Sequence, residues 1–182
     1  MSNYSVQTIA SAPEGSKSAL EQLKKAFGVI PNIVGAIANS AKLVNSLVGL
    51  FRQVHSPGLT EAENQIVLLT DAVTNSSTYA VAFHTALALQ QGISSGETTA
   101  IREGRLPTDE RFAALSALAK ALIEKRGHLT DPELDSFKAA GFTKEQVLEV
   151  IAIVAASTIT NYTGTIANPP LEDAFRQHAW RG

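Results

Sequence analysis

The sequence predicts an all-α protein, and three observations support this prediction. At four of the expected helix starts, Ser or Thr is followed three residues later by Glu or Gln, which is the spacing of a capping box at a helix N-terminus. Five glycines follow helix-like stretches, at the position where a left-handed residue ends a helix. Apolar residues also recur at steps of three and four, the period of one buried helix face.

These signals place the helices in order along the chain. The capping boxes are Thr60 with Glu63, Ser94 with Glu97, Thr130 with Glu133 and Thr143 with Gln146. The terminating glycines are Gly28, Gly92, Gly104, Gly127 and Gly141. We therefore predict helices over residues 13–27, 31–39, 41–55, 60–74, 77–91, 95–103, 109–126, 131–140 and 143–161.

The last two long helices are supported by different arguments. Residues 109–126 carry one apolar stripe, formed by Phe112, Leu115, Leu118, Ala119, Leu122 and Ile123. The segment Val147–Thr160 is rich in β-branched residues, so its periodicity alone is also compatible with a strand. Its length and the cap at Thr143 favour a buried helix.

Composition restricts the organisation of the chain and its partners. With 182 residues and 45% hydrophobic content, we expect one domain. It comprises an N-terminal helical extension (1–58), the core-motif helices (59–104) and C-terminal helices (105–182). The formal charge of -2 offers no basic surface, so we expect neither nucleic acid nor membrane as a partner. We see no signal peptide and expect a cytoplasmic protein.

The segment from Leu59 to Ser94 carries a resemblance to a known family. It reads LTEAENQIVLLTDAVTNSSTYAVAFHTALALQQGIS. This is similar to the core motif of the alkylhydroperoxidase D / carboxymuconolactone decarboxylase superfamily, in which a capped helix precedes Asn-x-Cys-x-x-Cys-x-x-x-His and a Gly-Ile/Val-Ser turn. The flanking segments, including FGVIPN from Phe27, resemble the peroxidase-related branch. The resemblance covers roughly residues 20–180 and implies an AhpD-like helical bundle.

The chain departs from this family at the residues that carry its chemistry. Ser77 and Ala80 stand at the two cysteine positions, and Gln65 stands where the resemblance implies a relay glutamate. His84 remains, and Asn75 and Tyr79 are the motif residues that we expect beside the ligand pocket. The chain contains no cysteine, so a dithiol cycle of peroxide reduction is chemically closed to it.

Helical spacing predicts how the remaining polar residues lie. Ser77, Ala80 and His84 share one helix face, and a short turn can bring Gln65 opposite His84. Glutamine cannot take up a proton as glutamate does, but it can fix the His84 tautomer by hydrogen bonding. Simpler roles stay open, because a single histidine on an apolar face is more often a core residue than a catalyst. Likewise, Ser77 is more typical of a helix cap than of a nucleophile.

Three hypotheses about function follow. The first is a non-redox protein that binds a small organic acid or lactone at His84 and runs acid–base or decarboxylase-like chemistry, with Arg52 or Arg102 as candidates to hold a carboxylate. The second is a catalytically inactive structural or regulatory protein. The third is the antioxidant peroxidase activity that the resemblance alone implies. We expect no cofactor and no metal site, and a homo-oligomer (dimer, trimer or hexamer), which the resemblance also implies.

Overall fold

The computed structural model describes residues 4–182, and every regular element in this part of the chain is a helix. The α-helices are α1 (Glu14–Phe27), α2 (Asn32–Ile37), α3 (Ala41–Val54), α4 (Glu61–Thr74), α5 (Thr78–Gln90), α6 (Ser95–Arg102), α7 (Glu110–Glu124), α8 (Asp131–Ala139) and α9 (Lys144–Ala167). A 3₁₀ helix follows at Asp173–His178. The all-α prediction is confirmed, and the segment with the ambiguous β-branched pattern is helical.

Local capping explains why most helix ends lie where the sequence predicts them. Complete capping boxes form at Thr60 and at Thr143, and all five predicted glycines have a positive φ between 74° and 88°. At Ser94 only half of the predicted box forms. The Ser94 side chain accepts from the Glu97 amide, but the Glu97 carboxylate accepts from the Thr108 amide at 2.7 Å instead. Glu97 thereby fixes the start of α7.

The last helix is longer than predicted. α9 continues to Ala167 and ends at Asn168, which adopts the left-handed conformation with φ 44°. The predicted end at residue 161 is wrong because Asn161 lies inside the protein and bonds to Ser157 one turn earlier, so it does not cap the helix. By length and composition alone, α9 could cross a membrane.

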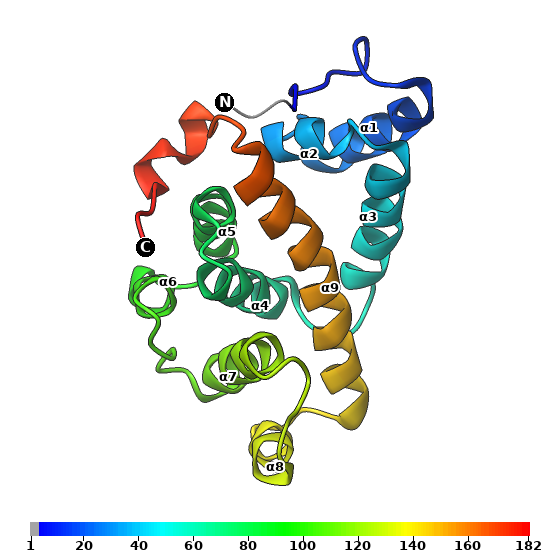
Figure 1. Cartoon of the computed structure of the whole chain (residues 1–182). Coiled ribbons are helices and arrows are strands. Elements are labelled where there is room, and N and C mark those ends of the chain that lie inside the picture. The colour runs from blue at the N-terminus through cyan, green and yellow to red at the C-terminus, as the bar shows by residue number, and fades with distance from the viewer. Residues whose placement is uncertain (1–3) are drawn as a thin grey trace.

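Helix α9 crosses the middle of the molecule, with α1–α3 on one side and α4–α7 on the other (Figure 1). It contacts α2, α3, α4, α5 and α7. The cytoplasmic location stays a prediction.

The buried apolar residues form two clusters that meet beside α9. One cluster joins α4, α5, α7 and α9 through residues such as Ile66, Leu69 and Leu115. The other joins α1, α2 and α3 and includes Tyr79 from the first turn of α5. Both clusters contribute to the lining of one cavity, so the candidate site lies where they meet.

Candidate functional site

His84 is held by the hairpin that α4 and α5 form. A short turn at Asn75–Ser77, in which Ser76 has φ 52°, reverses the chain and packs the two helices together. This brings the Gln65 carboxamide to the His84 ring, with 3.0 Å between Gln65 Oε1 and His84 Nδ1. The structure therefore brings together the two residues that helical spacing placed opposite each other.

The hydrogen bonds continue from Gln65 to the surface. Gln65 Nε2 donates to Glu61 Oε1 at 2.8 Å, and His55 Nδ1 lies 2.7 Å from Glu61 Oε2. Burial acts to raise the pKa of the Glu61 carboxyl, but the hydrogen bonds from His55 and Gln65 outweigh it and lower the pKa. Glu61 is therefore an ionised carboxylate that accepts from both neighbours.

This ionised carboxylate decides the direction of the whole chain of hydrogen bonds. A carboxylate only accepts, so the Gln65 amide nitrogen must point to Glu61 and its carbonyl oxygen to His84. The carbonyl oxygen in turn accepts only from a protonated Nδ1. His84 is thus fixed as the Nδ1–H tautomer, and its Nε2 carries the free lone pair.

His84 is uncharged at neutral pH. Its side chain is buried, with 7% of the residue exposed, and burial lowers its pKa to about 4. The positive field of His55 lowers the pKa further, and Glu61 opposes this effect. A neutral imidazole can accept a proton or a hydrogen bond at Nε2.

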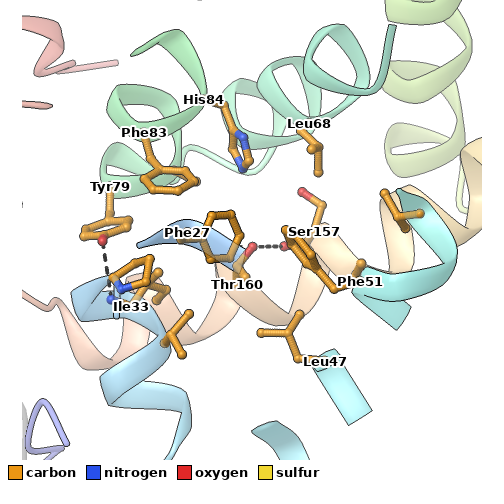
Figure 2. A pocket seen from close by; sticks show the side chains of 15 residues that line it. Phe27, Ile33, Leu47, Phe51, Leu68, Tyr79, Phe83, His84, Ser157 and Thr160 are labelled. Atoms are coloured by element: carbon orange, nitrogen blue, oxygen red, sulfur yellow. Dashed lines mark hydrogen bonds between the residues drawn. The ribbon is translucent and has the colours of Figure 1, made fainter. Parts of the chain in front are cut away.

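The His84 ring borders a small inner cavity of about 40 Å³. Figure 2 shows His84 above this space and Ser157 and Thr160 of α9 across from it, with Phe27 between them, Phe83 beside His84 and Phe51 beside Ser157. Phe83 meets both Phe27 and the His84 ring edge to face. The walls are therefore mainly apolar, with aliphatic and aromatic side chains, and polar groups enter from two opposite sides.

A larger cleft of about 750 Å³ lies on the other side of the same aromatic residues. It shares Phe27, Phe51, Leu68, Phe83 and His84 with the inner cavity. The cleft also takes in the polar chain of His55, Glu61 and Gln65 and two cationic side chains, Lys25 and Arg52. Its volume is typical of sites for small organic ligands, which occupy roughly 300–1,000 Å³.

Solved structures resemble the chain along nearly its whole length, whereas no family model and no curated protein matches its sequence. A peroxidase-related protein with an AhpD core from Ralstonia eutropha JMP134 has a TM-score of 0.80 and 18% identity, over 96% of this chain and 94% of that one. The debrominase Bmp8 has a TM-score of 0.79 and 17% identity, over 97% and 95%.

A further neighbour agrees with these two. A peroxidase-related protein from Silicibacter sp. TM1040 has a TM-score of 0.75 and 14% identity, over 90% of this chain and 87% of that one. The chain has the AhpD-like fold. The resemblance predicted from the motif is therefore confirmed at the level of the fold.

In this AhpD-like fold, the two positions of the missing cysteines lie at the first turn of α5. Ser77 is the N-cap of α5, but its side chain makes no capping bond, and its buried Oγ has no hydrogen-bond partner among residues 4–182. The expected capping bond is therefore not formed. Ala80 lines the inner cavity, whereas Ser77 faces Gly164 of α9.

The other expected site residues lie at different distances from the cavity. The Tyr79 ring lines it, but its hydroxyl donates to Glu172 at 2.8 Å. Asn75 ends α4, donates to the Asp71 carbonyl and lines neither the cavity nor the cleft. Arg52 lines the cleft, whereas Arg102 binds the backbone at His178 and Ala179.

Sequence reasoning missed three residues of this site: Glu61, His55 and Lys25. The signal for Glu61 was present, because it precedes Gln65 by four residues and must share its helix face. His55 and Lys25 come from the ends of α3 and α1, and their approach depends on tertiary packing alone. Within residues 4–182, no three His, Asp or Glu side chains gather in a way that could hold a metal ion.

Proposed function

We propose that this AhpD-like protein binds a small organic molecule in the cleft and acts on it by acid–base chemistry without redox change, with His84 as the proton acceptor. The observation that carries the proposal is the chain from Glu61 through Gln65 to His84 Nδ1, which leaves Nε2 free beside the cavity. A general base needs a free lone pair in reach of the ligand, and this arrangement supplies one.

The cleft supports a ligand with an apolar or aromatic body and an acidic or polar end. Phe27, Phe51 and Phe83 offer ring surfaces, and Lys25 and Arg52 offer positive charge for a carboxylate or a lactone oxygen. Bmp8, which shares the fold, has been solved in complex with 2,3,4-tribromopyrrole in a cysteine-to-alanine variant. A small aromatic ligand is therefore compatible with this architecture.

The alternatives receive less support. A filled site would support a catalytically inactive role, whereas the cleft is open and polar side chains converge in it. Antioxidant activity would need electrons from another molecule, because the chain has no thiol of its own. Peroxide consumption with dithiothreitol or a dihydrolipoyl donor tests this, and turnover above the buffer blank would overturn the non-redox proposal.

Ligand binding tests the proposal directly. We expect aromatic carboxylates and lactones to raise the melting temperature in a thermal-shift screen. Arg52→Gln should lower the affinity for carboxylates by about tenfold, the usual effect of losing a charge-assisted hydrogen bond, and should leave the affinity for neutral lactones unchanged. His84→Ala should lower the affinity for both carboxylates and lactones. Lys120→Gln, at a partly exposed lysine of α7 that does not line the cleft, is the matched control. If no compound of either class shifts the wild type, the proposal fails.

The tautomer of His84 gives a second test that needs no ligand. Imidazole ¹⁵N spectra of the wild type should show a protonated Nδ1 and an unprotonated Nε2 on His84. Glu61→Gln removes the group that orients Gln65, so both tautomers should then appear. Glu124→Gln, on the exposed surface of α7, is the control. A wild type that already shows both tautomers would remove the observation on which the proposal rests.

A further inference from the structure

The inner cavity and the cleft lie next to each other, and their sizes restrict what each can hold. Five residues, His84 among them, line both spaces. The inner cavity of about 40 Å³ exceeds the roughly 10–15 Å³ that one water molecule needs, but it is much smaller than the roughly 150 Å³ of a cavity that holds benzene. The cleft of about 750 Å³ has room for an aromatic ring. A ring in the cleft can therefore place only a small substituent, such as a hydroxyl, in the inner cavity.

A row of ring contacts runs along the cleft from His84 to His55. Its members contact one another with centroid distances between 4.4 and 6.5 Å, in the order His84, Phe83, Phe27, Phe51, His55. The hydrogen bonds through Gln65 and Glu61 join the same two histidines by a second route. All of these side chains line the cleft. They form a closed circuit, in which one part offers ring surfaces and the other holds the polar groups in place.

The inner end of the cleft accepts a hydrogen bond and carries no charge. His84 donates its Nδ1 proton to Gln65, so its Nε2 is an acceptor. The residue is 7% exposed, and burial keeps the ring neutral at pH 7 because it lowers the pKa to about 4. A carboxylate placed here would be buried without a cation and would face another acceptor, which is costly. A group that donates a hydrogen bond is therefore favoured at this end.

The outer end of the cleft is positively charged. Lys25 in the last turn of α1 and Arg52 in the last turn of α3 line it, and both are exposed. Arg52 donates to the neutral side chain of Gln22, which holds the guanidinium without cancelling its charge. Glu61 is the carboxylate in the lining, and its two oxygens bond to Gln65 and His55. A carboxylate of the ligand is therefore favoured at the outer end alone.

We propose that the cleft binds an aryl carboxylate with a hydroxyl on the ring opposite the carboxylate. The hydroxyl enters the inner cavity and donates to His84 Nε2, the ring packs against the phenylalanine rings, and the carboxylate stays with Lys25 and Arg52. This inference rests on the proposed function and deepens it, because it names the class of ligand and its orientation.

Isothermal titration calorimetry with four related acids tests this orientation. We expect 4-hydroxyphenylacetate to bind about tenfold more tightly than phenylacetate or 4-methylphenylacetate, because only its hydroxyl satisfies the buried acceptor. The 2-hydroxy isomer carries its hydroxyl beside the carboxylate and should bind no more tightly than phenylacetate. Equal affinity for the 4-hydroxy and 4-methyl compounds, or no binding of any of the four, would overturn this inference. The proposed function is judged separately, by the wider thermal-shift screen that includes lactones.

Substitutions assign the preference to a residue. His84→Ala should abolish the preference for the 4-hydroxy over the 4-methyl compound. Arg52→Gln should lower the affinity for both compounds equally and leave the preference intact. His128→Ala is the matched control, since His128 is exposed and lines neither the cleft nor the inner cavity. A preference that persists in His84→Ala would contradict the assigned orientation.

A measurement on the wild type needs no substitution. The ¹⁵N signal of the unprotonated His84 Nε2 should move towards the position of a protonated nitrogen when 4-hydroxyphenylacetate binds, because Nε2 then accepts a hydrogen bond. The signal should move much less with 4-methylphenylacetate. Equal movement with both ligands, or none with the bound 4-hydroxy compound, would place the hydroxyl elsewhere and overturn the inference.

Discussion

At the scale of single residues, two buried ionisable groups, His84 and Asp71 of α4, place opposite demands on pH. In the folded protein the pKa of His84 is lowered from its ordinary value of 6.5 to about 4. Between these two pH values the unfolded chain therefore binds a proton at His84 that the folded protein does not bind. Stability from the neutral His84 is therefore lost as pH falls from about 6.5 to about 4. Asp71 has a raised pKa, so the unfolded chain releases a proton that the folded protein keeps. The Asp71 contribution therefore lowers stability as pH rises.

Asp71→Asn separates these two effects. The amide has nearly the same shape and never ionises, so it removes the penalty that grows above the ordinary Asp pKa. We expect the variant to be more stable than the wild type at about pH 8, by about 1.4 kcal/mol for each unit of pKa difference that it removes. The gain should shrink towards about pH 4.

Urea unfolding of both proteins at several pH values measures this dependence. Asp135→Asn on the exposed side of α8 is the control, because it removes a carboxyl without removing a buried one. A variant that is less stable than the wild type at all pH values would indicate that Asp71 is ionised and held by partners.

The site also marks the limit of sequence reasoning at this scale. Gln65 and His84 could be paired from helical spacing, because both lie on helices joined by a short turn. The approach of Lys25 to the cleft beside His84 could not, since α1 and α5 are far apart in the chain and no local pattern specifies how they pack.

At the scale of elements, helix boundaries were predictable wherever a local hydrogen bond sets them. Thr60, Thr143 and the left-handed glycines act within one turn, so the sequence contains the whole cause. The long end of α9 was not predictable in this way. Asn161 resembles a helix-ending residue in isolation, and only the buried Ser157 beside it explains why the helix continues.

Gly35 and Gly49 give an element-scale prediction in which the same change has opposite results. A Cβ on Gly35 of α2 would lie 2.7 Å from Val6 Cγ1 and 2.8 Å from the Gln7 carbonyl oxygen, whereas a Cβ on Gly49 of α3 would meet nothing within 4 Å. Gly35→Ala should therefore push the N-terminal segment off α2 and destabilise the protein by about 1–3 kcal/mol. Gly49→Ala should stabilise it by about 0.5–1 kcal/mol, because alanine is the better helix former.

Thermal and urea unfolding of the two variants measure both effects. Loss of the bond from the Gln7 amide to the Gly35 carbonyl should also speed amide exchange at Gln7 in the first variant only. Equal effects of the two substitutions would mean that helix propensity alone decides, and that residues near Gln7 do not pack on α2.

At the scale of the whole molecule, α9 serves two purposes along its length. Its inner side fills the core between the two apolar clusters and carries Ser157 and Asn161. Its outer side leaves large apolar residues in solvent, including Leu148 at 67% and Ile166 at 66% exposed, with Ile151 and Tyr162 between them. Apolar residues aligned on one exposed helix surface favour contact with another protein.

We expect this outer surface of α9 to join copies of the same chain, in agreement with the homo-oligomer predicted from sequence. The double change Leu148→Glu and Ile166→Lys puts charges at both ends of the surface without touching the core, so the fold should persist while the oligomer dissociates. Light scattering coupled to size exclusion measures the mass, and circular dichroism verifies the helices. Leu106→Glu, at an apolar residue 50% exposed outside α9, is the matched control and should keep the wild-type mass. A monomeric wild type, or an unchanged mass in the double variant, would contradict this prediction.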